Sequence, residues 1–380
     1  MFCADSGLIS ERVLQESKKV YPPNQKPSCR LVSLIESLQG QGLLERSELA
    51  NRQFEDCDAQ MKLCAVSESL GNLSLKEAAE VSANLGLAAL EIGMGNWSAA
   101  PHADLNALLQ SKDKRHEFLF VFEQNGLSLA ALNCSGNQLH LVDGERQSKV
   151  VYDTIRVAEL LDVHTIVLMS GLPAGGPNDL RPNWITCAWP PENREILDWQ
   201  WEAKLVPYWE KIAAFARDCG VTRLCIELHG HQLVYNVPTL LKLRRQVGEI
   251  VGANLDPSHL FWMGANPLAA IDALGDAIHH VHAKDTSLNE GAMNLTGRLE
   301  TIGHEHVKDR AWNYITLGYG HGEQWWRQFC YRLRLNGYDG WLSIEHEDIV
   351  LSRMEGLRRS VEVLKSALAD EPSDYRLPTN

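Results

Sequence analysis

The chain has 380 residues, of which 44% are hydrophobic and 22% are charged, so a folded protein with a sizeable core is expected rather than a disordered chain. Its formal net charge of −13 argues against binding nucleic acid through a broad basic surface, because phosphate recognition needs clustered lysines and arginines. Nine cysteines without a Cys-x-x-Cys pair, no apolar run of bilayer length and no export signal predict a soluble cytoplasmic protein with reduced thiols, no membrane association and a small-molecule substrate.

The first part of the chain differs from the rest. Residues 1–60 are polar and contain the proline-rich stretch Tyr21–Pro27, which predicts an N-terminal extension. The main domain is predicted over residues 61–370, followed by a C-terminal tail over 371–380. Met61 opens the first predicted strand directly, which is also compatible with a protein that starts at Met61.

From Met61 onwards, short apolar runs alternate with amphipathic helical stretches, the pattern of parallel β/α units. Strands are predicted at 62–66, 88–92, 128–132, 165–169, 223–228, 250–255, 278–283 and 341–344. Helices are predicted between them, for example at 75–85, 149–161, 201–218, 237–247, 267–274 and 323–335, with 355–368 closing the domain. Eight such units predict a (β/α)8 TIM barrel. A doubly wound open sheet is the competing architecture, but no Gly-x-Gly-x-x-Gly turn follows the first strand.

Two connections are unusually long. Residues 171–198 and 285–322 both follow predicted strands, so both are expected at the C-terminal face of the barrel. Loops of this length within a compact domain usually serve function. We expect them to cover the binding pocket.

Four consecutive strands near the end of the chain finish with a residue type that binds metals. These residues are Glu227, Asp256, His282 and Glu345. The carboxyl ends of parallel barrel strands meet at one mouth, so the four side chains are expected to converge there. Three carboxylates and one imidazole suit a divalent cation, with Mn²⁺ as the first choice and Mg²⁺, Co²⁺ or Zn²⁺ as alternatives.

Each of these residues also has a simpler explanation. A lone acid at a strand end is often a helix cap, and Asp256-Pro-Ser has the sequence of one. The convergence of four is what favours a metal site. His229 and His259 flank the proposed ligands and are candidates for proton transfer or for binding a substrate hydroxyl.

Further polar residues follow the same strands. Lys284 is a candidate contact to a substrate oxygen, although an ion pair with Asp285 or another carboxylate explains it equally well. Asn137, after the third strand, is a second substrate-binding candidate, or it simply builds a turn. The glycine-rich segment Gly318–Gly322 precedes a helix and is a candidate anion-binding turn.

With these segments together, the chain resembles the sugar phosphate isomerase/epimerase family, the xylose isomerase-like TIM barrels, from about Met61 to about Leu368. The resemblance is densest in the segments Cys187–Pro191, Ile226–His229, Asn254–Trp262, His280–Asp285 and Leu342–Asp348. It implies that Glu227, Asp256, His282 and Glu345 bind the metal and that His259 contacts the substrate. The sequence departs from the pattern at Ser135, where many relatives have histidine, and at Gly230, where a proline is common.

The resemblance and the residues together predict a metal-dependent isomerase or epimerase acting on a carbohydrate. Glu227 and Glu345 would remove and return a proton through an enediolate, and His229 or His259 would move the hydroxyl proton. One alternative is a lyase that cleaves 3-keto glycosides, with His229 acting on the aglycone hydroxyl. Another is a sugar-binding barrel without turnover. Similar barrels often assemble as homo-oligomers, which is a further expectation.

Overall fold

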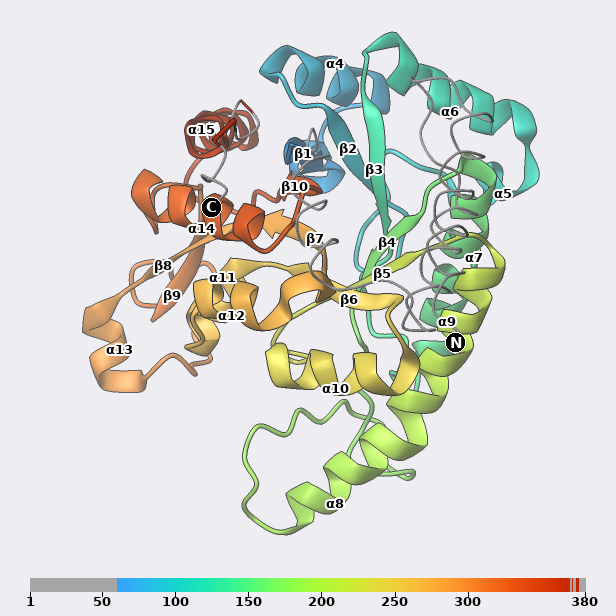
Figure 1. Ribbon diagram of the computed structural model, residues 1–380. Helices are drawn as coiled ribbons and strands as arrows, with labels where there is room; N and C mark the ends of the chain where they lie inside the picture. Colours follow the sequence, from blue (N-terminus) through green and yellow to red (C-terminus); the bar gives the residue numbers. More distant parts are fainter. Residues whose placement is uncertain (1–59, 370, 372–373, 376–380) are drawn as a thin grey trace, which may run out of the picture. The chain divides into compact units, whose positions relative to one another are not determined.

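The structure, a computed structural model, describes residues 60–369, 371, 374 and 375, and its centre is a closed barrel of parallel strands (Figure 1). The strand order around the barrel is β1-β10-β7-β6-β5-β4-β3-β2. The strands are β1 (Lys62–Val66), β2 (Ala89–Gly93), β3 (Ser128–Asn133), β4 (Thr165–Leu168), β5 (Arg223–Glu227), β6 (Val251–Leu255), β7 (Ile278–Ala283) and β10 (Trp341–Ile344). The predicted (β/α)8 TIM barrel is thereby confirmed, and every predicted strand begins and ends within one residue of an observed strand.

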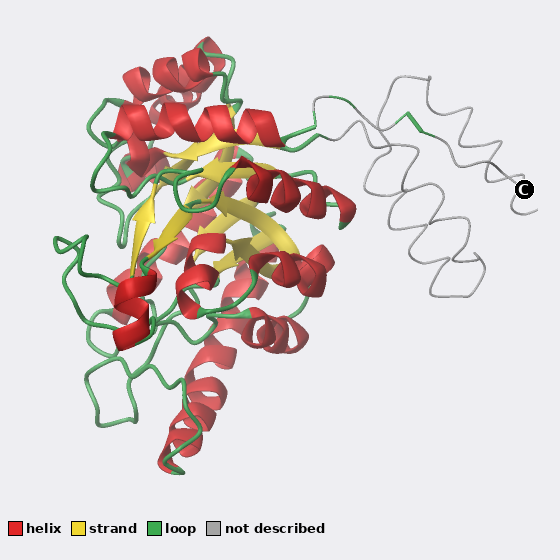
Figure 2. Ribbon diagram, turned by 90° about the vertical axis from the view of Figure 1, so that its left-hand side faces the viewer, coloured by secondary structure: helices red, strands yellow, loops and turns green. Residues whose placement is uncertain are grey.

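Helices surround the strands (Figure 2). They are α4 (Leu75–Leu85), α5 (Leu105–Gln110), α6 (Lys112–Gln124), α7 (Gly144–Leu161), α8 (Glu192–Trp199), α9 (Val206–Asp218), α10 (Val237–Val247), α11 (Pro257–Met263), α12 (Pro267–Leu274), α13 (Glu290–Thr296), α14 (Glu323–Leu335) and α15 (Arg353–Ala367). Local sequence sets several of the starts. The Ser74 hydroxyl accepts from the N–H of Glu77, and the Glu77 carboxylate accepts from the N–H of Ser74, so a capping box begins α4.

The helix predicted at 201–218 begins earlier than expected. Residues Glu192–Trp199 form α8, Gln200–Leu205 continue as a π-helical segment, and α9 follows without a break. The charged and aromatic residues at the start of this stretch hide its helical period, which explains the late predicted start.

The long connection at 285–322 contains structure of its own. Its two ends form an antiparallel hairpin of β8 (Asp285–Leu288) and β9 (Trp312–Ile315), and α13 lies between these strands. The indole rings of Trp312, on β9, and Trp262, on α11, stack with centroids 4.9 Å apart. The hairpin is therefore packed against the helix that follows β6.

Most buried apolar residues lie in one cluster between the strands and the helices. Along β1, Leu63 and Ala65 belong to this cluster, whereas Cys64 belongs to a separate small cluster with Ala89 and Ala130. Because side chains alternate across a strand, these small residues face the inside of the barrel. Small inward residues leave room near the mouth for larger polar side chains.

Two predicted segments lie largely beyond what the structure describes. The extension at 1–60 falls outside the described residues except for Gln60, and so does most of the tail at 371–380. Within the described part of the chain, no helix combines the length and apolar character needed to cross a membrane.

Candidate metal centre

The four strand-end residues meet at the mouth of the barrel. Glu227 is the last residue of β5, Asp256 follows β6, His282 lies near the end of β7, and Glu345 follows β10. One ligand atom from each lies within 4.8 Å of the ligand atoms of the others. Glu227, Asp256 and His282 are buried, and Glu345 is partly exposed. The structure thus brings the predicted ligand set together in one place.

Asp256 caps a helix with one carboxylate oxygen and faces the cluster with the other. It is the N-cap of α11, and its Oδ1 accepts a hydrogen bond of 2.8 Å from the N–H of Ser258. Its Oδ2 remains directed to the cluster, 3.3 Å from Nζ of Lys284 and 3.2 Å from Nε2 of His259. The capping and ligand explanations of this residue are therefore compatible, because each uses a different carboxylate oxygen.

Charges in the cluster are balanced by a buried lysine. Nζ of Lys284 lies 2.7 Å from Oε2 of Glu345 and 3.2 Å from Oε2 of Glu347. Burial alone would raise the pKa of Glu345, but the Lys284 ammonium and the His282 imidazole outweigh it and lower this pKa to about 2. The pKa of Asp256 is also lowered, because Lys284 and His259 outweigh its burial. Both carboxylates are ionised at neutral pH, as metal ligands must be.

The donor set fits a divalent cation. Asp256 Oδ2, His282 Nδ1 and Glu345 Oε2 are buried atoms without a well-formed hydrogen bond, although each has an oppositely charged group within 4 Å. Their ion pairs with Lys284 and with one another supply charge but no well-formed hydrogen bond, so each atom still has a lone pair that can ligate a cation. Carboxylate oxygens and an imidazole nitrogen are suitable ligands for such an ion.

His259 lies beside the cluster rather than in it. Its Nε2 lies 2.7 Å from Oε1 of Glu227, and its Nδ1 lies 2.9 Å from the hydroxyl of Tyr314. Burial would lower the pKa of His259, but the carboxylate of Asp256 raises it to about 9. Tyr314 comes from the hairpin strand β9, and sequence reasoning missed it because that region showed no strand pattern.

His229 also reaches this region, and its tautomer follows from its contact. Its Nδ1 is hydrogen bonded to the carbonyl oxygen of Gly230, which can only accept, so Nδ1 carries the proton and Nε2 carries the lone pair. Burial and the neighbouring His259 hold the pKa of His229 well below its ordinary value. The imidazole ring lies 4.1 Å from that of His259, centroid to centroid. His229 is a neutral proton acceptor beside the cluster.

Gly230 has a steric reason to lack a side chain. A Cβ at this position would lie 2.2 Å from Cη2 of Trp262, far inside van der Waals contact. A larger residue at this position would therefore collide with the Trp262 ring unless the ring moved.

Asn137 is placed differently from the other predicted residues. Its side-chain amide donates to the carbonyl of Leu172 at 2.9 Å and accepts from the N–H of Leu172 at 2.8 Å. These two hydrogen bonds tie the loop of Asn137 to the loop of Leu172. Neither of them involves a residue of the ligand cluster. These bonds account for Asn137 as a residue that holds the loops together, and its role in substrate binding stays a prediction.

The glycine-rich turn does bind an anion, which is a carboxylate of the chain itself. Oδ2 of Asp285 accepts hydrogen bonds from the N–H groups of Gly318, Gly320 and His321, and Oδ1 pairs with Nδ1 of His321 at 2.8 Å. Asp285 is thus occupied by this turn, and Lys284 pairs with the cluster carboxylates instead. The turn fixes the end of β7 next to the mouth.

Sequence reasoning also missed Glu91, in the middle of β2. This carboxylate is fully buried and contacts His280 and His282. A single acid inside the apolar run Ala88–Ile92 was the available signal. Buried carboxylates are rare unless they are paired, so such a position calls for partners elsewhere in the chain.

The chain is similar to a known family and to a known protein over most of its length. The model of the family described as xylose isomerase-like TIM barrel matches residues 79–367. An uncharacterised protein of Bacillus subtilis, YfiH, is 46% identical over 312 residues, which is 81% of this chain and 100% of that protein.

Two solved structures share the fold at low sequence identity. A D-tagatose 3-epimerase-like protein is 21% identical with a TM-score of 0.54, over 81% of this chain and 98% of its own. A xylose isomerase-like TIM barrel protein from Mycobacterium smegmatis, in complex with magnesium, is 15% identical with a TM-score of 0.54, over 81% and 98% of the two chains.

Proposed function

This chain belongs to the xylose isomerase-like TIM barrel family, and from that premise we propose that it is a divalent-metal-dependent isomerase or epimerase of a sugar or keto-sugar. The observation that carries the proposal is the cluster of Glu227, Asp256, His282 and Glu345, whose ligand atoms lie within 4.8 Å of one another. The epimerase-like neighbour among the solved structures agrees with this choice of reaction at the level of the fold.

These four residues would hold the cation. When bound there, a divalent cation would polarise a substrate carbonyl and lower the pKa of the adjacent C–H bond. Mn²⁺ is the first candidate, and Mg²⁺, Co²⁺ and Zn²⁺ are alternatives, because carboxylates and one imidazole are compatible with each.

The position of the two glutamates supports proton transfer on both sides of a carbon. Glu345 and Glu227 come from the ends of the strand arc β10-β7-β6-β5, with His282 and Asp256 between them. One carboxylate would remove a proton from the substrate carbon, giving an enediolate, and the other would return a proton from the opposite side. Removal and return from opposite faces inverts the carbon, and transfer between neighbouring carbons isomerises the sugar.

His229 and Lys284 would assist at the substrate oxygens. Because His229 is neutral and its Nε2 carries a lone pair, it would accept the proton of a hydroxyl group. The pKa of Lys284 is raised by the carboxylates of Glu345 and Glu347, which outweigh its burial, so it would face an oxyanion as an ammonium.

The lyase reaction needs a proton donor for the leaving oxygen of the glycosidic bond. Nε2 of His229 accepts rather than donates in this arrangement, so the donor would be another group, such as the Lys284 ammonium. Cleavage of 3-keto glycosides is therefore the second candidate function.

The test is incubation of metal-loaded protein with a panel of sugars, keto-sugars and 3-keto glycosides in D₂O. Deuterium at a carbon next to a carbonyl, in a sugar of otherwise unchanged composition, is the expected result, read by NMR and mass spectrometry. A released aglycone would show the lyase reaction instead. Binding of sugar with no deuterium in any substrate of the panel would show a barrel without turnover.

A further inference from the structure

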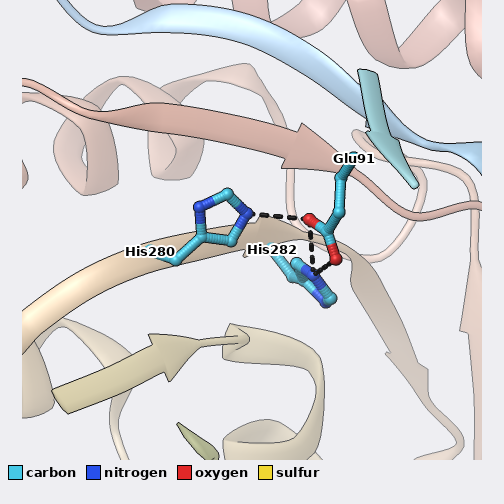
Figure 3. Close-up of side chains that lie close together, drawn as sticks. All are labelled: Glu91, His280 and His282. Atoms are coloured by element: carbon cyan, nitrogen blue, oxygen red, sulfur yellow. Dashed lines mark hydrogen bonds and ion pairs between the residues drawn. The ribbon is translucent and has the colours of Figure 1, made fainter. Parts of the chain in front are cut away.

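A buried carboxylate lies directly behind the candidate metal ligand His282. Glu91 lies in β2, where its neighbours Leu90 and Ile92 belong to the outer core, so Glu91 faces into the barrel. It has no exposed surface. Figure 3 shows its carboxylate pointing at His280 and His282 from across the barrel.

The carboxylate of Glu91 accepts hydrogen bonds from three side chains. Oε1 lies 2.7 Å from Nδ2 of Asn133 and 3.0 Å from Nε2 of His282, and Oε2 lies 2.8 Å from Nε2 of His280. An ionised carboxylate can only accept, so each of these nitrogens must carry a hydrogen. The pattern thus places a proton on Nε2 of His282.

The other nitrogen of His282 is the one that faces the metal cluster. Nδ1 lies 3.2 Å from Oε2 of Glu345 and 3.9 Å from Oε2 of Glu227, and it has no well-formed hydrogen bond. Because Nε2–H is held by Glu91, Nδ1 is the atom that can offer a lone pair when a cation takes the place of its proton. Glu91 thus fixes the ring orientation of His282 and keeps a proton on Nε2.

We propose that Glu91 is a positioning residue for metal binding, which holds His282 with its Nε2–H on Glu91 and its Nδ1 directed to the cation. This inference rests on the proposed function, because it concerns the same metal centre. Carboxylates that orient a ligating histidine typically change metal affinity by about 10-fold to 100-fold when they are removed.

A second metal ion held by Glu91, His280 and His282 is the competing explanation, since their atoms also lie close enough to share one. The hydrogen-bond distances of 2.7 to 3.0 Å argue against it, because direct N–H donation to a carboxylate accounts for all of them. An ion there would also require His282 to ligate through both nitrogens. The arrangement favours one ion, with Glu91 behind its histidine ligand.

The first experiment measures Mn²⁺ and Co²⁺ affinity by calorimetry for wild type, Glu91→Gln, His282→Gln and the double variant. Glutamine keeps the size of Glu91 but replaces one carboxylate oxygen by an NH2 group, whose two N–H donors oppose the N–H donors around it. We expect Glu91→Gln to weaken binding about 10-fold to 100-fold in the wild-type background and less than about twofold in the His282→Gln background. Equal losses in both backgrounds, or no loss, would overturn the proposal.

Two further variants act as controls. Glu80→Gln changes an exposed glutamate on α4 and is expected to leave affinity unchanged. His280→Gln removes one ligand of the competing site, and the proposal expects wild type and His280→Gln each to bind one equivalent of ion. Two equivalents in wild type and one in His280→Gln would establish the competing site.

A metal-free readout separates this inference from the proposed function. NMR of ¹⁵N-histidine-labelled protein should show a protonated, slowly exchanging Nε2 for His282 in wild type, and faster exchange of that proton in Glu91→Gln. An unprotonated Nε2 in wild type, or unchanged exchange in the variant, would overturn the positioning role. Failure of the wild-type protein to bind any ion would instead defeat the proposed function, while the NMR result would still decide the role of Glu91.

Discussion

The two halves of the barrel carry different kinds of inward side chain. Strands β5, β6, β7 and β10 end in Glu227, Asp256, His282 and Glu345, which form the candidate metal centre. Strands β1 to β4 present mostly small residues to the inside, such as Cys64, Ala89 and Val167, with Glu91 and Asn133 as polar exceptions. The two exceptions join each other and, through Glu91, reach His282 in the other half.

One half of the barrel, β5, β6, β7 and β10, therefore carries the candidate metal ligands. The other half, β1 to β4, supports them through Glu91 and through packing. The ligands sit at consecutive positions in the barrel order, so one ion can touch all of them without reaching across the barrel. The supporting half needs only one long acidic side chain to reach the rear of a ligand. Apart from Glu91, substitutions in the supporting half should therefore change stability without changing metal affinity.

The largest expected effect is on metal affinity, from Asp256→Asn. Asparagine keeps the cap on α11, because its oxygen can still accept from Ser258, but it removes the charge facing the cluster. Losing a direct ligand should cost more than losing a supporting group, so Mn²⁺ affinity should fall by more than about 100-fold, with loss of turnover. The matched control is Asp104→Asn, at the N-cap of α5, which should bind metal like wild type. Retained affinity in Asp256→Asn would contradict the ligand assignment.

Lys284→Met tests the charge balance of the same half. Without metal, the variant leaves Asp256, Glu345 and Glu347 without the ammonium that now pairs with them. Removing one partner of a buried ion pair costs about 3 kcal/mol, so the metal-free variant should unfold at clearly lower urea concentration. A bound cation replaces the missing charge, so added Mn²⁺ should stabilise the variant more than wild type. Equal stability of the two metal-free proteins would refute this account of Lys284.

A substitution in the supporting half, β1 to β4, should lower stability and leave metal affinity unchanged. Ile166, on β4, is fully buried in the outer core, so Ile166→Ala should lower the free energy of unfolding by about 3 kcal/mol through the lost contacts and the cavity. Mn²⁺ affinity of the folded variant should stay within about twofold of wild type, because Ile166 faces the helices rather than the mouth. Urea unfolding and calorimetry on one preparation measure both. A large loss of affinity would show that the halves are coupled beyond Glu91.

The sequence predicts the barrel well because its signals are local. Apolar runs bounded by turn residues locate each strand, and the rule that parallel strand ends share one mouth brings Glu227, Asp256, His282 and Glu345 together without knowledge of packing. The extent of α8 and the hairpin of β8 and β9 were missed, because their charged and aromatic residues show neither period clearly.

What the sequence cannot show is the choice of partner between distant segments. Glu91 and His280 are 189 residues apart, and no local pattern pairs them. The same holds for Tyr314, which reaches His259 only because the hairpin folds against α11. Likewise, the sequence alone allowed Asn137 to bind substrate or to build a turn, and in the structure its side-chain amide is hydrogen bonded to the backbone of Leu172. Which atom of a side chain faces the site is decided by packing, not by spacing.

The smallest expected effect separates the two faces of a single strand, β7. His282 faces the mouth, whereas Nε2 of His279 lies 3.3 Å from Nη1 of Arg244, on α10, and must accept a hydrogen bond from it. Burial and the Arg244 charge lower the pKa of His279 to about 4, from an ordinary value of 6.5. The folded protein therefore binds this proton less tightly than the unfolded chain does. The stability it contributes is fully present above pH 6.5 and is lost as the pH falls towards 4.

His279→Gln should remove this pH dependence, because glutamine can accept from Arg244 but does not titrate. Between pH 7 and pH 4.5, the variant should gain about 2 kcal/mol in the free energy of unfolding relative to wild type, as measured by urea unfolding at each pH. His116→Gln, at an exposed position on α6, should keep the wild-type profile. At pH 7 the His279→Gln variant should bind Mn²⁺ like wild type, since the residue lies on the far side of the strand from the ligands. If the free energy of unfolding changed equally with pH in variant and wild type, His279 would have the same pKa in the folded and the unfolded state. The outer face of β7 would then be less enclosed than the contact of His279 with Arg244 implies.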